Sequence, residues 1–248
     1  MVNLVEAQKP LLHFLIKWAG LRQHTVDVDG AGTVLTFWVP KDKVPGNNST
    51  VAPEEKQSET SKSQGVRRPS VVLVHGFAAE GIVTWQFQVG ALAKHYDVYI
   101  PDLLYFGGST SSAELLLPES VKGLKALLSI AAHRRLWFPE RLHRDFLEVM
   151  FTNRKERAEL LEGLVVSNKD ATVPVLPQKI LLLWGHNDNI FNIELAKTMK
   201  EQLGEKTMLQ SIDKAGHLVH LERPCVYNQR LMEFLAYATA EACKEPAN

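Results

Sequence analysis

The amino-acid sequence predicts an α/β fold in which a mostly parallel sheet is flanked by helices, and three observations support this. Two short apolar runs have the composition of strands that are buried on both faces of a parallel sheet. Each run ends in a polar segment that contains glycine and histidine. Helix-like and strand-like patterns then alternate, which is typical of right-handed βαβ units. We expect strands at 71–74, 97–100, 180–184 and 207–212, and helices at 83–95, 193–203 and 224–242.

The composition is that of an ordinary globular chain, and it argues against several classes of function. The 248 residues carry 28 basic and 28 acidic side chains, so no charge excess favours a nucleic-acid partner. The two cysteines, Cys225 and Cys243, provide no disulfide framework and no metal-ligand spacing, which favours a reducing compartment and a cytoplasmic location. The first residues do not resemble a signal peptide, and no apolar run has the length of a membrane span. We expect neither a cofactor nor a metal.

The N-terminal part of the chain combines an apolar segment with a hairpin. Residues 11–18 read Leu-Leu-His-Phe-Leu-Ile-Lys-Trp, which suits a helix packed on its own domain or a peripheral contact with a membrane; we favour the packed helix. Residues 24–39 alternate in polarity around a glycine-containing turn and predict an antiparallel hairpin. Residues 41–69 contain almost no large apolar side chain, so we expect a disordered insertion there.

Residues 113–176 have a helical pattern. Leu124, Leu127 and Ala131 recur at helical spacing, and Pro118 and Pro139 suit first turns. We therefore expect the chain to be organised as an N-terminal helix and hairpin (1–40), a disordered insertion (41–69), the first half of the core (70–112), a helical cap (113–176), the second half of the core (177–243) and a tail (244–248).

Residues with catalytic chemistry follow three of the expected strands. His75-Gly76-Phe77 comes after the first strand, where glycine permits a tight turn and a backbone N–H can point at a developing oxyanion. Asp188 and His217 lie beyond two strands that we expect to be adjacent and parallel, so both lie at the edge of the sheet where ligand sites gather. An aspartate in this place can hold the imidazole tautomer and stabilise the imidazolium.

Two further polar groups close to His217 allow other interpretations. His220 lies three residues after it, and a metal-binding pair is conceivable, but no acidic or thiol third ligand is placed nearby. Glu222 and Arg223 suit a surface pair or a helix entry.

Four segments together carry a resemblance to a known family: Val-Val-Leu-Val-His-Gly-Phe at 71–77, Tyr-Ile-Pro-Asp-Leu-Leu-Tyr-Phe-Gly-Gly-Ser at 99–109, Leu-Trp-Gly-His-Asn-Asp at 183–188 and Lys-Ala-Gly-His at 214–217. They resemble α/β-hydrolases, and in particular the plant-type esterases related to monoacylglycerol lipases. The resemblance implies a carboxylic ester as substrate, Asp188 and His217 as triad members, and the N–H of Phe77 in the oxyanion hole. It also implies a helical cap over 113–176.

The sequence lacks the nucleophile that these residues would serve. No two of its fifteen glycines lie four positions apart, so the motif G-x-S-x-G is absent from the chain. By resemblance, the serine strand, its helix and the next strand belong between Asp102 and the cap, where the chain runs directly through Ser111 into Ala113. We expect roughly 60 residues to be absent at this junction, as in a truncated or alternatively spliced product.

Neither a nearby serine nor Asp102 is a convincing replacement for the nucleophile. Ser109, Ser111 and Ser112 lack the strand–turn–helix setting that projects a serine toward its base, and they suit a polar loop. Asp102 follows a proline on the wrong strand and suits a structural turn.

Loss of the central strands leaves two outcomes for the sheet. Either the strand at 180–184 pairs with the strand at 71–74, which gives four parallel strands beside the hairpin, or interior edges are exposed and the chain folds poorly.

Three functions remain in competition. The one we favour is a hydrolase-type protein that keeps the acid and base but has little or no esterase activity. The others are an esterase that has recruited a different serine and a non-catalytic ligand-binding or regulatory protein. The expected small-molecule partner is an ester or an apolar ligand, and a regulatory protein would bind the full-length enzyme. The sequence does not indicate an oligomeric state.

Overall fold

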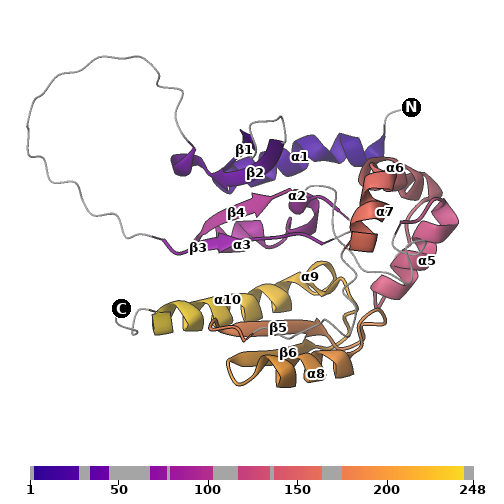
Figure 1. Ribbon diagram of the computed structural model, residues 1–248. Coiled ribbons are helices and arrows are strands. Elements are labelled where there is room, and N and C mark those ends of the chain that lie inside the picture. Colours follow the sequence, from indigo (N-terminus) through magenta and orange to yellow (C-terminus); the bar gives the residue numbers. More distant parts are fainter. Residues whose placement is uncertain are drawn as a thin grey trace, which may run out of the picture.

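The computed structural model describes residues 3–27, 34–44, 68–76, 79–102, 117–134, 137–163 and 175–242, and its strands form two separate sheets (Figure 1). The larger sheet has the order β1-β2-β4-β3, and the smaller sheet pairs β5 with β6. The strands are β1 (Leu21–Asp27), β2 (Val34–Pro40), β3 (Ser70–Val72), β4 (Asp97–Pro101), β5 (Ile180–Gly185) and β6 (Thr207–Ile212).

Helices lie against both sheets and at one end of the molecule (Figure 1). They are α1 (Leu4–Trp18), α2 (Gly81–Thr84), α3 (Val89–Leu92), α5 (Val121–Ala131), α6 (Glu140–Met150), α7 (Arg154–Gly163), α8 (Ile193–Leu203), α9 (Val219–Glu222) and α10 (Pro224–Ala242). A 3₁₀ helix follows β2 at Lys41–Lys43. Among the helices of the described ranges, none has the length and apolarity needed to span a bilayer.

The expected α/β fold class is confirmed, and so are most of its elements. Strands β1 and β2 form the antiparallel hairpin, in a register that pairs Leu21 with Pro40. The ladders β3–β4 and β5–β6 are parallel, as the βαβ pattern predicts. Helix α8 ends at Gly204, whose φ of 85° lies in the left-handed region that glycine adopts without strain.

Three local expectations need correction. The prediction of a single helix at 83–95 is wrong, because the chain turns between α2 and α3. The side chain of Gln88 is buried at this turn, and its amide N–H donates to the carbonyl of His220 at 3.0 Å. Pro118 lies before α5 rather than in its first turn, because Ser120 caps that helix by accepting from the N–H of Gly123. The expected insertion at 41–69 begins with the 3₁₀ helix, and residues 45–67 lie outside the described residues.

Of the two outcomes considered for the sheet, pairing of the strand at 180–184 with the strand at 71–74 does not occur in the described ranges. Within the described ranges, β3 pairs only with β4, and β5 pairs only with β6. Helix α10 lies between the two sheets in Figure 1 and packs against both of their cores. The side chains involved are Leu231, Met232 and Leu235 on the side of the larger sheet, and Val226 and Tyr227 on the side of the smaller one.

Strand β3 is correspondingly less buried than its composition predicts. Val72, the last residue of β3, is 60% exposed, and Val74 just after the strand is 52% exposed, although a strand inside a parallel sheet buries such side chains on both faces. Such exposure is expected if the strand beside β3 is absent. The two sheets are therefore held together by helix packing and loops rather than by a continuous ladder.

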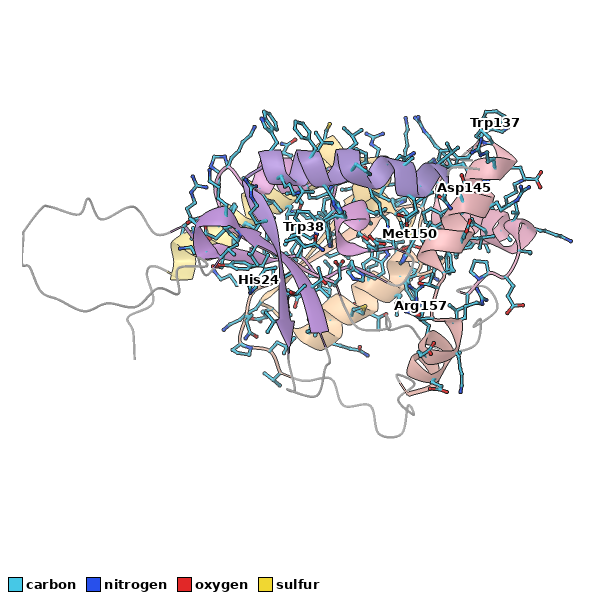
Figure 2. The ribbon with its side chains drawn as sticks, turned by 90° about the horizontal axis from the view of Figure 1, so that it is seen from above. His24, Trp38, Trp137, Asp145, Met150 and Arg157 are labelled. Atoms are coloured by element: carbon cyan, nitrogen blue, oxygen red, sulfur yellow. The ribbon has the colours of Figure 1, made fainter. Side chains whose placement is uncertain are left out.

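Helix α1 is fixed to the rest of the protein along its whole length. The side chain of Asn3 caps its first turn, and a carboxylate oxygen of Asp145 in α6 accepts from the N–H of Leu4 at 2.7 Å. In its middle, Lys9 pairs with Glu80 at 2.8 Å. At its C-terminal end, Ile16 is buried in the core that also contains Trp38, labelled beneath α1 in Figure 2.

The bridging role of α10 predicts a specific loss of stability. We expect Leu231→Ala to lower the free energy of unfolding by about 1 to 2 kcal/mol, because the removed side chain is partly buried against the larger core. Glu233→Ala on the exposed face of the same helix should change it by less than about 0.5 kcal/mol. Urea unfolding of both variants measures the difference, and equal effects would contradict the role assigned to α10.

Candidate functional site

Asp188 and His217 are brought together at the carboxyl ends of β5 and β6. Because these strands are parallel and Gly185 pairs with Ile212, the loops that follow them leave the sheet side by side. Nδ1 of His217 lies 3.0 Å from Oδ2 of Asp188. The Asp188 side chain is almost fully buried, whereas that of His217 is 38% exposed. This is the geometry of an acid that orients a solvent-accessible base.

The charge of Asp188 is stabilised by several donors. Burial alone raises the pKa of this carboxyl, but the hydrogen bond from His217 and the N–H groups of Phe191 and Ile190 outweigh it and hold the pKa below its ordinary value. The two N–H groups lie 2.9 and 2.8 Å from Oδ1. An ionised Asp188 requires that Nδ1 of His217 carries the proton, so neutral His217 has its lone pair on Nε2.

The two loops are joined by backbone contacts that leave no room for side chains. A Cβ on Gly185 would lie 2.1 Å from the carbonyl oxygen of Gly216, and a Cβ on Gly216 would lie 2.7 Å from the carbonyl oxygen of Ala131 at the end of α5. The N–H of Asn187 donates to the carbonyl of Ala215 at 2.9 Å. The position of the acid relative to the base therefore depends on two glycines.

Glu222 is a second support of the His217 loop, a role that no sequence motif indicates. One of its carboxylate oxygens accepts from the N–H of Gly216 at 2.8 Å, and the other accepts from the N–H groups of His133 and Arg134 at 2.9 and 3.3 Å. The interpretation of Glu222 as a surface or helix-entry residue is wrong, because its carboxylate joins the loop to the end of α5. A motif search has no signal for such distant backbone partners.

His220 is partly buried and packs against two aromatic rings. Its ring lies 5.3 Å from that of Trp85 and 6.0 Å from that of Tyr227. Burial, with a smaller contribution from the neighbouring His217, lowers the pKa of His220 to about 4. No group of three potential metal ligands occurs among the residues that the structure describes.

His75 lies three residues after β3, where its buried side chain forms a second contact with an aspartate. Its Nδ1–H donates to the carbonyl of Gly76 at 2.9 Å, and its Nε2 lies 3.9 Å from Asp102, which accepts from the N–H of Gly81 at 2.9 Å. Burial lowers the pKa of His75 and raises that of Asp102. Asp102 thus supports a turn, as its sequence indicates. The expected oxyanion donor, Phe77, lies outside the described residues, as do Ser109, Ser111 and Ser112.

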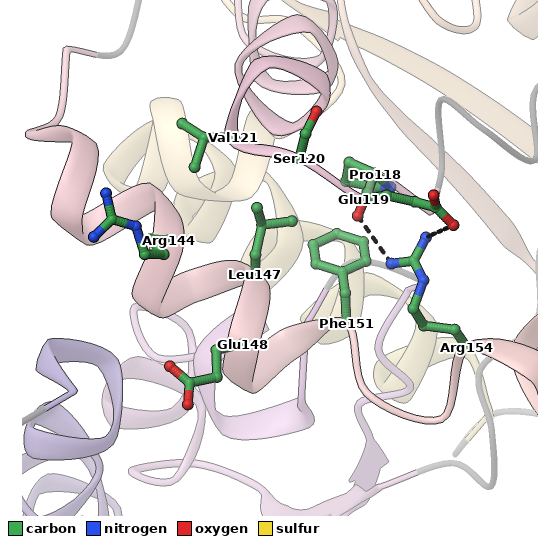
Figure 3. A pocket seen from close by; sticks show the side chains of 9 residues that line it. All are labelled: Pro118, Glu119, Ser120, Val121, Arg144, Leu147, Glu148, Phe151 and Arg154. Atoms are coloured by element: carbon green, nitrogen blue, oxygen red, sulfur yellow. Dashed lines mark hydrogen bonds and ion pairs between the residues drawn. The ribbon is translucent and has the colours of Figure 1, made fainter.

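A hollow of about 650 Å³ opens in the cap, but it does not include the acid–base pair (Figure 3). The guanidinium of Arg154 on its rim donates to the carbonyls of Leu117 and Pro118 and lies 3.3 Å from Glu119. The charge of Arg154 is therefore already engaged within the cap. Its lining is Pro118, Glu119, Ser120, Val121, Arg144, Leu147, Glu148, Phe151 and Arg154.

Solved structures of esterases and lipases share this fold. A bacterial membrane phospholipase A aligns with a TM-score of 0.68 at 17% identity, over 95% of this chain and 91% of its own. A putative lipase from Acinetobacter baumannii AYE aligns with a TM-score of 0.66 at 18% identity, over 94% and 97%. The carboxylesterase CesB from Bacillus subtilis aligns with a TM-score of 0.55 at 12% identity, over 92% and 98%.

The chain therefore has an α/β-hydrolase fold, in which the described strands form two small sheets. At these identities the likeness concerns the fold. No protein-family model and no curated protein sequence matches the chain.

The contact between the two loops predicts that Gly185→Ala lowers the free energy of unfolding by about 2 to 3 kcal/mol, because the added methyl group overlaps the backbone of Gly216. Gly90→Ala is the matched control. A Cβ at this position of α3 would have no neighbouring atom within 4 Å, so the free energy of unfolding should stay unchanged or rise slightly. Urea unfolding tests the pair, and a neutral Gly185→Ala variant would contradict the contact.

Burial of His220 predicts a loss of stability in mild acid. Its pKa is about 4 in the folded chain and about 6.5 when unfolded, so between these values the unfolded state binds more protons. The free energy of unfolding should fall by about 3 kcal/mol between about pH 6.5 and pH 4 from this residue alone. His220→Phe keeps an aromatic ring and should remove this part of the pH dependence. Equal pH slopes in both proteins would contradict the burial.

Proposed function

We propose that the chain is a protein of the serine esterase and lipase type whose ester hydrolysis is impaired. The observation that carries the proposal is the 3.0 Å contact between Asp188 and His217 in a sequence without G-x-S-x-G. The substrate class would be carboxylic esters, with monoacylglycerol-like molecules suggested by the resemblance to plant-type esterases. A cytoplasmic location is part of the proposal and rests on the cysteine content.

The chemistry open to the pair is general-base catalysis without covalent catalysis. Nε2 of neutral His217 can accept a proton, and the ionised Asp188 stabilises the imidazolium that forms. No elbow serine is present to receive this assistance and attack an ester carbonyl. Loss of a catalytic serine costs on the order of a millionfold in turnover, so background hydrolysis is the expected level.

The proposal includes an internal block of missing residues between Asp102 and the cap. Two observations support it: β3 and β5 each have an edge without a strand partner in the described ranges, and Val72 and Val74 are largely exposed beside one of these edges. A substituted serine in an otherwise complete chain would leave these strands covered. A block deletion accounts both for the absence of G-x-S-x-G and for the unpaired edges of β3 and β5.

A second candidate function is the binding of an ester-like or apolar ligand without turnover. The observation that favours it is an exposed aromatic side chain beside the base. Phe191 is partly exposed, and its ring lies 5.5 Å from that of His217 in an edge-to-face arrangement. A ligand of this kind would raise the melting temperature without being consumed.

We expect the purified chain and its His217→Ala variant to hydrolyse p-nitrophenyl esters at similarly low rates, because no serine nucleophile uses the base. His186→Ala is the matched control, since it removes an exposed histidine from the neighbouring loop. Release of p-nitrophenolate at neutral pH measures all three rates. A rate that falls tenfold or more in His217→Ala, but not in His186→Ala, would reveal a recruited nucleophile and overturn the proposal.

A further inference from the structure

Helix α1 has an apolar face that is directed away from the protein. Five large apolar side chains are exposed along it, at positions that recur every three, four or seven residues and therefore share one side of the helix. They are Leu4, Leu11, Phe14, Leu15 and Trp18, and we call them the outer face of α1. Phe14 and Trp18 are the most exposed, at 62% and 81%. An exposed stripe of this size marks an interaction surface.

The outer face is not the face by which α1 packs on its own domain. Val5 and Ile16 are buried on the other side of the helix, where Lys9 also makes its ion pair with Glu80. The capping contacts of Asn3 and Asp145 hold the N-terminal end against α6. Helix α1 therefore has two apolar sides, one that packs on its own domain and one that is exposed. Figure 2 shows α1 lying across the surface of the molecule.

Positive charge surrounds the C-terminal end of the outer face. Lys17, Arg22 and Lys94 are all exposed there, and none of them has an ion-pair partner within the part of the chain that the structure describes. A guanidinium N–H of Arg22 donates to the carbonyl of Lys17, which places this residue at the end of the helix. Lys94 and Trp18 line the same shallow groove between α1 and α3.

This groove continues the outer face into the body of the protein. It has a volume of about 360 Å³, and most of its lining is apolar. Leu15 and Trp18 form one side, and Val89 and Ala93 form the other. The arrangement combines an apolar surface, a terminal tryptophan and three adjacent cations, as in helices that lie in the interface of a membrane.

We propose that the outer face of α1 binds the surface of a bilayer that contains anionic phospholipids. Leu11, Phe14 and Trp18 insert at the boundary between headgroups and acyl chains. Lys17, Arg22 and Lys94 contact the negatively charged headgroups. The occupant is a lipid surface, because the three exposed cations at the end of the apolar stripe complement the negative charge of the headgroups. The proposal does not depend on esterase activity.

The test is flotation of the full-length chain with vesicles of phosphatidylcholine, alone or mixed with phosphatidylglycerol. We expect binding to the mixed vesicles that Phe14→Ser/Trp18→Ser weakens about a hundredfold, since two large apolar side chains lose their burial in the bilayer. Val175→Ser replaces a side chain that is 96% exposed elsewhere on the surface, and it should leave binding unchanged. Lys17→Gln/Arg22→Gln/Lys94→Gln should reduce the preference for anionic vesicles about fivefold for each cation.

Two results would overturn the proposal. One is the absence of vesicle binding by the wild-type chain, or binding that Phe14→Ser/Trp18→Ser leaves unchanged. The other is a wild-type dimer in sedimentation equilibrium that the same variant dissociates, which would assign the outer face to a second copy. Both substituted residues are exposed, so circular dichroism should show the helical content of the wild type in the variant.

Discussion

The acid–base pair depends on the close approach of the two loops that leave β5 and β6. Gly185 and Gly216 allow their backbones to touch, and the carboxylate of Glu222 ties the second loop to the end of α5. The donors that stabilise Asp188 also come from its own loop. These contacts belong to the part of the chain that follows the proposed deletion. The acid and base can therefore keep their geometry although the elbow that they would serve is missing.

The arrangement of the two sheets concerns the other consequence of the proposed deletion. A ladder between β3 and β5 would have restored one continuous sheet, but α10 lies between the two half-sheets and packs its side chains on both cores. Helix packing buries apolar surface without satisfying the unpaired edges of β3 and β5. As a result, α10 connects the cores of the two sheets, while Val72 and Val74 stay largely exposed.

The sequence was sufficient to predict the elements with strong periodicity and the residues that follow them. Asp188 and His217 were found because parallel strands bring their carboxyl ends to one edge, a rule that needs only strand order. The same rule could have paired His75 with Asp102, which follow β3 and β4. The role of Glu222 could not be predicted, because its partners at 133 and 134 are backbone groups far away in the sequence. The break between α2 and α3 depends on a tertiary contact of Gln88 in the same way.

The central claim is that the pair has no nucleophile to activate. Its most direct test is the intact mass of the protein after exposure to an excess of a fluorophosphonate, which reacts with a serine only when a neighbouring base activates it. The account predicts that the mass of the wild-type chain stays unchanged, as does that of the His217→Ala variant. A single stoichiometric adduct on the wild-type chain that is absent from His217→Ala would contradict it.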